Sequence, residues 1–216
     1  MKLSTEWHEE AGERLPMACW HPGPGYRMIS SGVLGGGIGP REWVLNAQVP
    51  SGYARMDPAG HLLELSGGLG LTGPGVGMLT AASVTDLVSR SDEGVSAAVT
   101  AGLRVPTWAA APAGAPDPDL APGTINIIVS VPAPLADAAL VNAVMTATEA
   151  KTQAVLDAGF PGTGTATDSV CVAVPDTPGG EAFAGPRSVW GARIARAVYA
   201  AVLAGAKTYA AGLRPR

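Results

Sequence analysis

A narrow seam of polar side chains runs along one predicted helix, which spans residues 134–159. Residues spaced by four, seven and eleven positions share a helix face, and this spacing groups Asn142, Thr146, Glu149 and Gln153. An amide, a hydroxyl and one carboxylate are suited to hydrogen-bonding a polar ligand. The same seam is also compatible with the solvent face of an amphipathic helix. The apolar residues on the flanking faces predict that most of the helix is otherwise buried: Leu140, Val141, Val144, Met145, Val155 and Leu156.

A hydroxyl and an amine lie close together on the same helix. Lys151 is on roughly the opposite side from Asn142, and it can reach Thr148, three residues earlier. Such a pair can act as nucleophile and base, because an amine with a lowered pKa can take the hydroxyl proton. Thr148 can equally be an ordinary helix hydroxyl that bonds its own backbone. Nucleophilic catalysis and a structural role therefore both remain open.

A threonine-rich segment, GTGTATD at 162–168, follows this helix. If the segment is extended, alternation places Thr163, Thr165 and Thr167 on one side. Asp168 then adds a carboxylate, as a base or a cation partner. The alternative is a turn in which Thr and Gly make local backbone bonds. We expect polar side chains of the 142–153 helix segment and the 163–168 bend to converge on one cleft.

Two asparagines lie on predicted strands, where they can add amide groups to a site. Asn46 is near the end of a strand predicted over 43–49, and Asn126 is in a strand predicted over 123–131. Polar groups at strand ends are often functional. Asn46 is therefore a candidate ligand-binding residue, and Asn126 is a candidate because its amide could hold an oxyanion or the amides of a ligand.

Several catalytic motifs are absent from the sequence. There is no GxSxG elbow, which argues against a Ser-His-Asp hydrolase. His8, His21 and His61 are far from the polar stretches, and no HExxH motif or His/Cys cluster is present. Cys19 and Cys171 are far apart and lack CxxC spacing. The sequence therefore predicts no metal ligands and no disulfide framework.

The hydrophobic periodicity of the sequence predicts the strands and helices that must position these groups. Alternating or apolar runs predict strands at 26–30, 43–49, 93–103, 123–131 and 169–174, and a long helix at 188–213. The strand–helix–strand order over 123–174 predicts a βαβ unit. We expect an α/β or α+β fold, with a single layered domain at 36–216 whose mixed β-sheet is packed by helices. Residues 1–35 are predicted to be a peripheral N-terminal lead-in, and residues 109–123 an exposed loop.

Composition narrows the class of protein further. Of the 216 residues, 47% are hydrophobic, and the net charge is −4 with no basic stripe. Clustered Lys and Arg are needed for phosphate contacts, so nucleic-acid binding is not expected. No apolar run is long enough for a signal peptide or a membrane span. We expect a cytoplasmic protein without a membrane span; the oligomeric state is left open.

Taken together, several segments resemble the adenosylcobinamide amidohydrolase family. The order and spacing match over residues 40–205, and the most specific pieces are GTINIIV, VNAVMTATEAKT and TGTATDS. Further matching segments are LNAQVPSGYARMDP, TGPGVGMLTAASV and FAGPRSVWGARIARAVYAAV. The chain has PGTGTATD where the family is expected to carry a segment close to ATGTGTD. This departure leaves the roles of Thr165 and Thr167 open.

The resemblance implies an enzyme that hydrolyses the amide linking aminopropanol to the corrin side chain of adenosylcobinamide. The products would be adenosylcobyric acid and 1-amino-2-propanol, for corrinoid salvage and adenosylcobalamin synthesis. Amide hydrolysis needs an activated oxygen, a stabilised oxyanion and a proton for the leaving amine. The candidate catalytic residues are Glu149, Asp168, Lys151 and Thr146. The candidate substrate-binding residues are Asn46, Asn126, Asn142, Thr163, Thr165 and Thr167.

Two alternatives remain beside the amidohydrolase. One is a non-catalytic corrinoid-binding module, and the other is a hydrolase or acyltransferase that acts on another amide through Thr148 and Lys151. In the leading interpretation the corrinoid is the substrate, and the sequence indicates no required cofactor. The expected partner is a small-molecule corrinoid.

Overall fold

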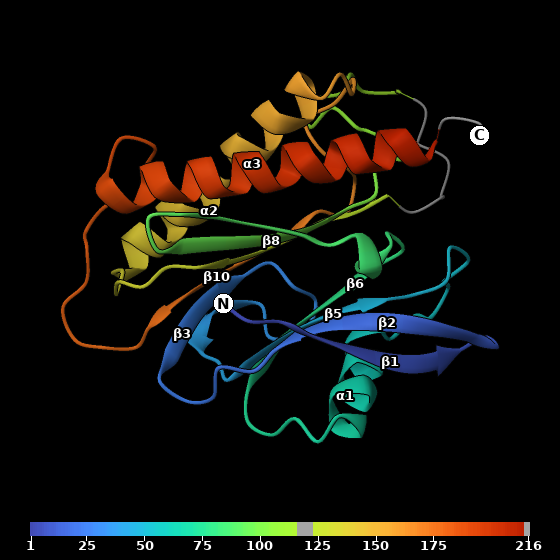
Figure 1. The fold of residues 1–216 in the computed structure, drawn as a ribbon, viewed down its shortest axis with the longest axis horizontal. Helices are drawn as coiled ribbons and strands as arrows, with labels where there is room; N and C mark the ends of the chain where they lie inside the picture. Colours follow the sequence, from blue (N-terminus) through green and yellow to red (C-terminus); the bar gives the residue numbers. More distant parts are fainter. Residues whose placement is uncertain (116–122, 214–216) are drawn as a thin grey trace.

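Two β-sheets pack against each other in the computed structural model, which describes residues 1–115 and 123–213 (Figure 1). One sheet has four strands in the order β1–β2–β5–β6, and the other has six in the order β4–β3–β10–β9–β8–β7. Both contain one parallel pair, β5–β6 and β9–β10, among antiparallel neighbours. The strands are β1 Ser4–Glu10, β2 Glu13–Trp20, β3 Tyr26–Ser30, β4 Gly37–Pro40, β5 Trp43–Gln48, β6 Gly75–Thr80, β7 Val88–Asp92, β8 Val95–Ala101, β9 Ile125–Ser130 and β10 Ser169–Pro175.

Helices cover the outer faces of both sheets. The helices are α1 Pro58–Gly68, α2 Asp137–Asp157 and α3 Val189–Gly212, with a short 3-10 helix, η1, at Val84–Asp86. In Figure 1, α2 and α3 lie over the six-stranded sheet, and α1 lies under the four-stranded sheet. This is a mixed α+β fold, as predicted, but with two mixed sheets in place of one. None of the described helices combines the length and apolar character needed to cross a bilayer.

Three apolar clusters fill the spaces between these layers. Because strand side chains alternate between faces, β9 directs Ile125, Ile127 and Val129 toward α2 and α3. The intervening Ile128 joins a second cluster between the two sheets, together with residues of β5, β6 and β10. A third cluster, which includes Leu62 of α1, lies between α1 and the four-stranded sheet. The inter-sheet layer is thus closed over most of its area.

The βαβ unit predicted over 123–174 is confirmed, since β9 and β10 are parallel and α2 connects them. Asp137 in the first turn favours the helix N-terminus, and Gly159, with φ of +86°, follows its end. The prediction that the flanking faces are buried is wrong for Val141, Met145 and Leu156, which are 47%, 54% and 43% exposed, whereas Leu140 and Val155 are fully buried as predicted. The reason is that a stripe of small residues meets the core instead: Ala139, Ala143, Ala147, Ala150 and Ala154.

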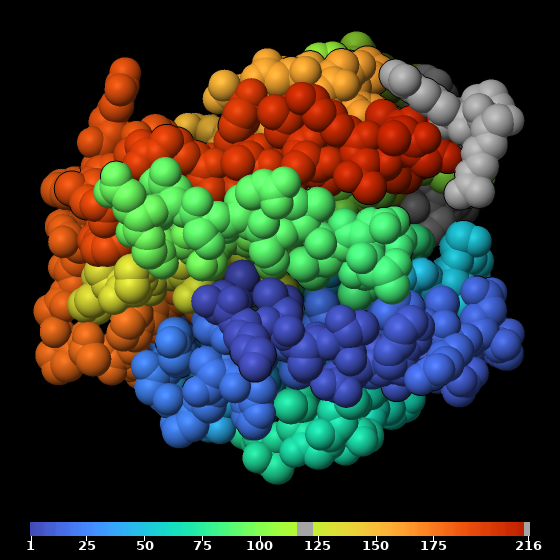
Figure 2. All heavy atoms as spheres, viewed as in Figure 1, coloured from blue at the N-terminus to red at the C-terminus, as the bar shows by residue number. Residues whose placement is uncertain are grey.

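The N-terminal segment is a β-hairpin rather than a peripheral lead-in. Strands β1 and β2 pair in register around Ala11 and Gly12, whose φ values of 50° and 79° suit a tight hairpin turn. β2 then pairs with β5 inside the four-stranded sheet. Figure 2 shows the N-terminal strands directly against the segment around β7 and β8 on this face. The predicted exposed loop at 109–123 lies partly outside the described residues; at 109–115 the chain is exposed, as predicted.

A glycine-rich loop at 31–36 runs along β6 and is held there by two backbone hydrogen bonds between Leu34 and Gly77. Gly35 has φ of +67°, and a Cβ on it would lie 1.9 Å from the carbonyl oxygen of Gly75. Both the backbone conformation and the close approach therefore require glycine at this position. The loop is thereby fixed against the first residues of β6.

We expect Gly35→Ala to lower the free energy of unfolding by about 3 kcal/mol, because strain in the left-handed region adds to the steric overlap. Gly70→Ala is the matched control, since Gly70 has φ of +68° but open space around its Cβ position. It is expected to cost about 1 kcal/mol. Urea unfolding of the three proteins measures both values, and equal losses would contradict the close packing of the loop.

Candidate active site

A cavity of about 330 Å³ opens at the rim of the inter-sheet layer, where β9 and β10 begin and β6 ends. Because β9 and β10 are parallel, their first residues lie side by side at this edge. The cavity, called the Asn126 pocket below, is lined by Ser31, Val33, Pro58, Met78, Leu79, Asn126, Thr167, Asp168 and Ser169. It therefore collects three of the predicted site residues, namely Asn126, Thr167 and Asp168.

Asn126 is the central polar group of this pocket and is only 1% exposed. Its amide nitrogen donates to Asn46 Oδ1 at 2.8 Å and to the Leu79 carbonyl oxygen at 2.9 Å. Asn46 in turn donates to the hydroxyl of Thr100 at 3.0 Å. These bonds use both hydrogens of the Asn126 amide and fix its orientation. Its Oδ1 is buried and receives no hydrogen bond from any described residue.

A pair of serine hydroxyls lies beside this amide. Ser169 is the register partner of Asn126 on the neighbouring strand, and its Oγ is 3.2 Å from Oγ of Ser31. Ser31 Oγ also accepts a hydrogen bond from the Val170 amide at 3.1 Å. The Ser–Ser bond uses one of the two hydroxyl hydrogens, so the other can donate to a ligand. The pocket thus offers one acceptor, on Asn126, and one donor, on either Ser31 or Ser169.

Asp168 and Lys151 form a largely buried ion pair next to the pocket. Lys151 Nζ lies 2.5 Å from Asp168 Oδ2, and the two side chains are 9% and 11% exposed. Asp168 also accepts hydrogen bonds from the Ile125 amide and from the amide and hydroxyl of Thr165. Four donors occupy all of the lone-pair positions of a carboxylate. In this arrangement Asp168 holds the bend and Lys151 in place and has no position left to accept a proton from water.

The predicted wall of threonine hydroxyls does not form, because residues 161–168 make turns and bends instead of an extended strand. Thr163 accepts a bond from the Ala109 amide, while Thr165 bonds Asp168. Thr167 pairs with the hydroxyl of Thr124 at 2.7 Å. Each hydroxyl therefore serves a different neighbour, and Thr167 alone among the three lines the pocket.

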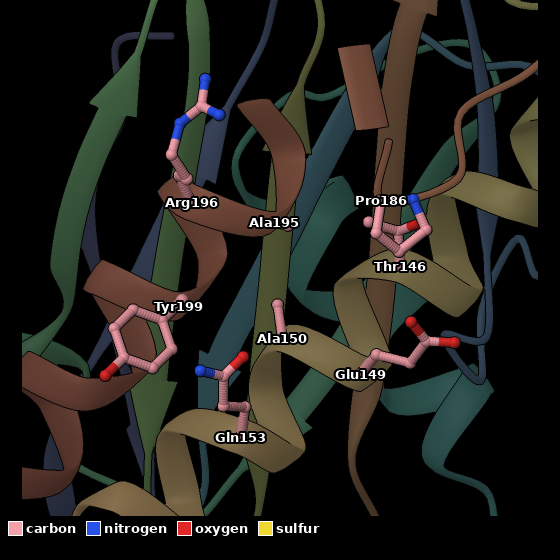
Figure 3. A pocket seen from close by; sticks show the side chains of 8 residues that line it. All are labelled: Thr146, Glu149, Ala150, Gln153, Pro186, Ala195, Arg196 and Tyr199. Carbon is pink, nitrogen blue, oxygen red and sulfur yellow. The ribbon is translucent and has the colours of Figure 1, made fainter. Parts of the chain in front are cut away.

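The polar seam of α2 lies elsewhere. Thr146, Glu149 and Gln153 line a groove between α2 and α3 together with Arg196 and Tyr199, shown in Figure 3. Thr146 is buried and donates to the Ala184 carbonyl oxygen at 2.8 Å. Arg196 binds Asp92, and Tyr199 donates to Asp157 at 2.9 Å. This α2–α3 groove has an exposed carboxylate from Glu149, but most of its other polar groups already have protein partners.

The predicted convergence of the 142–153 helix segment and the 163–168 bend on one cleft is therefore wrong in that form. Lys151 meets the bend, whereas Glu149, two residues earlier, faces roughly the opposite side of a helix with 3.6 residues per turn. Thr148 donates to the Val144 carbonyl oxygen at 2.8 Å, so it does not pair with Lys151. Asn142 is half-buried on the same helix. The catalytic and binding roles of all these residues stay predictions.

Sequence reasoning missed Ser31 and Ser169. Ser169 directly follows Asp168 in the TGTATDS segment, so its place at a strand start was a usable signal. Ser31 is the first residue of the glycine-rich loop, and its position depends on pairing with residues far along the chain. Cys171, on the same strand as Ser169, is not a comparable nucleophile: burial raises the pKa of its thiol to about 12, so it stays protonated near neutral pH.

Comparison with known proteins identifies the class of this protein. A family model described as adenosylcobinamide amidohydrolase matches residues 2–213, so the match includes the N-terminal hairpin. A Methanosarcina mazei protein named adenosylcobinamide amidohydrolase is 35% identical over 148 residues, which cover 68% of this chain and 69% of that protein. The chain is therefore a hydrolase that acts on an amide bond. More specifically, it belongs to the adenosylcobinamide amidohydrolase family.

We expect Lys151 and Asp168 to be strongly coupled in stability. Lys151→Met and Asp168→Asn should each lower the free energy of unfolding by about 3 kcal/mol, because each leaves a buried group without its partner. The double variant should lose at least about 2 kcal/mol less than the sum. Urea unfolding of the four proteins gives this coupling energy.

The exposed pair Arg196 and Asp92 provides the control cycle, through Arg196→Met and Asp92→Asn. Its coupling should be far smaller, because solvent screens exposed ion pairs. Additive losses at Lys151 and Asp168 would show that the buried pair does not hold the bend.

Proposed function

We propose that this protein hydrolyses the aminopropanol amide of adenosylcobinamide to adenosylcobyric acid and 1-amino-2-propanol. The proposed setting is corrinoid salvage in the cytoplasm, where the product re-enters adenosylcobalamin synthesis. The proposed place of cleavage is the Asn126 pocket. Membership of the family supports the activity, and the geometry of the pocket supports the location.

The observation that carries this proposal is the pairing of an unfilled acceptor with an unfilled donor. A secondary amide has one N–H and one carbonyl oxygen. Asn126 Oδ1 is a buried acceptor that can take the N–H, and the Ser31–Ser169 pair has a hydroxyl hydrogen for the carbonyl oxygen. Ser169 is the register partner of Asn126 on the adjacent strand, so we propose that both contacts are made to one amide group at the same time. Unpaired buried polar groups are costly, which makes a ligand of this chemistry the natural partner.

In the proposed reaction a water oxygen bonds to the carbonyl carbon, and the carbon–nitrogen bond then breaks. The water hydroxyl stays on the acyl carbon, and the remaining water proton goes to the amine nitrogen. The serine hydroxyl would stabilise the negative charge that develops on the carbonyl oxygen. Asp168 and Lys151 are proposed as positioning residues, because their mutual contacts fix the bend next to the reacting amide.

The size of the pocket limits which part of the substrate enters it. A volume of about 330 Å³ accommodates the amide arm rather than a whole corrin. Val33, which lines the pocket and is 53% exposed, offers apolar surface at its mouth. We propose that the macrocycle rests over this surface while the arm reaches Asn126.

Incubation of the purified protein with adenosylcobinamide should yield adenosylcobyric acid and 1-amino-2-propanol, detected by mass spectrometry. Ser169→Ala should lower kcat/KM roughly 10- to 100-fold, since one hydrogen bond to the developing oxyanion is lost. Ser91→Ala is the matched control, because Ser91 forms an exposed serine pair with Ser96 on β7 and β8. It should leave kcat/KM unchanged.

Other results would overturn parts of the proposal. Tight binding of adenosylcobinamide without product would indicate the non-catalytic corrinoid-binding module. Cleavage of other amides, without cleavage of adenosylcobinamide, would indicate a different substrate. A loss of activity in Glu149→Gln, with none in Ser169→Ala, would place the reaction in the α2–α3 groove.

A further inference from the structure

Three ligand-type side chains from two distant parts of the sequence meet between β1 and α1. One ring nitrogen each of His8 and His61 and one carboxylate oxygen of Glu10 all lie within 4.8 Å of one another. His8 and Glu10 are two residues apart on β1, so they point to the same side of the strand. His61 is on α1, which packs against the four-stranded sheet. None of the three lines the Asn126 pocket or the α2–α3 groove.

His8 is oriented as a metal-binding imidazole usually is. Its Nε2 lies 2.8 Å from the carbonyl oxygen of Gln48, so Nε2 carries the proton and donates it. The lone pair is then on Nδ1, which is buried and has no hydrogen-bond partner among the described residues. Metal-ligating histidines typically donate their second ring N–H to a backbone carbonyl or a carboxylate in this way.

Glu10 and His61 face the same space. Oε2 of Glu10 is buried without a partner in the described chain, and Oε1 lies 3.9 Å from Nδ1 of His61. Two ligands of a tetrahedral zinc ion with bonds near 2.1 Å are about 3.4 Å apart, so a small movement brings these atoms into range. The hydroxyl of Tyr53 lies 3.1 Å from Nδ1 of His61, and the two rings stack at 5.6 Å. The stacking holds buried His61 at the edge of the cluster, and an ion bound at Nδ1 would replace the hydrogen bond to Tyr53.

An ion pair between Glu10 and His61 is the simplest alternative use of these residues. It would leave the buried Nδ1 of His8 unpaired, and the 3.9 Å separation is too long for a hydrogen bond. A cation bound between the three groups satisfies the lone pairs of His8 and Glu10 together. Of the buried side-chain atoms without partners in the described residues, two of three belong to this cluster.

We propose that His8, Glu10 and His61 bind one divalent transition-metal ion, with zinc as the best match. Two imidazole nitrogens and one carboxylate oxygen are a donor set that suits zinc rather than calcium or magnesium. The ion would tie β1 to α1, and the first residue of α1, Pro58, lines the Asn126 pocket. This site is independent of the proposed function, and it goes beyond the sequence, whose spacing predicted no metal ligands.

The test uses the full chain after treatment with a chelator, titrated with Zn²⁺ by calorimetry and with Co²⁺ by visible absorption. One ion per chain should bind, and the melting temperature should rise with added Zn²⁺. Glu10→Gln and His8→Asn should each weaken Zn²⁺ binding at least tenfold. Circular dichroism of each variant without metal shows whether its fold is kept.

His21→Ala is the matched control, because His21 is exposed and lies outside the cluster. It should keep the affinity and stoichiometry of the original protein. The proposal is overturned if the original protein binds no Zn²⁺, or if folded Glu10→Gln and His8→Asn bind it as tightly as the original. It is also overturned if His21→Ala alone abolishes binding.

Discussion

The hydrogen bond between Asn126 and Asn46 joins the two β-sheets beside the apolar cluster that lies between them. Burying amide groups there is unfavourable unless each finds a partner. Thr100 and the Leu79 carbonyl oxygen complete the pairing on one side. The side-chain oxygen of Asn126, Oδ1, has no hydrogen-bond partner among the described residues. It lies at the rim, and the rest of the candidate site is arranged around it. The pocket therefore lies where this polar network reaches the rim of the inter-sheet layer.

A second constraint acts behind the pocket, through the ion pair of Lys151 and Asp168. The bend between α2 and β10 passes so close that a Cβ on Gly164 would lie 2.2 Å from Asp168 and 2.4 Å from Lys151. Glycine at this position lets the chain wrap around the charged pair, and the pair in turn holds the start of β10. Ser169 follows directly from that anchor. The ion pair, the glycine bend and the start of β10 therefore together fix the position of the Ser169 hydroxyl.

Local patterns in the sequence were sufficient to predict the βαβ unit, because the alternation in β9 and the length of α2 are properties of each segment alone. Asn126 was a candidate for the same reason, since alternation separates it from the isoleucines on either side. The orientation of α2 was not predictable in this way. Its alanine stripe faces the core together with Leu140 and Val155, whereas Val141, Met145 and Leu156 are exposed, and this choice depends on what α3 and the sheet present. Ser31 and the cluster of His8, Glu10 and His61 depend on pairings between distant segments, which periodicity does not report.

The hairpin of β1 and β2 also protects the sheet to which it belongs. β2 supplies the hydrogen-bonding partner for one side of β5, and β6 supplies the other. A polypeptide starting at residue 36 would leave β5 as an open edge with unpaired backbone groups, a surface that readily recruits strands from other molecules. Designs for recombinant production should therefore retain the first twenty residues, even though their charged composition makes them look dispensable.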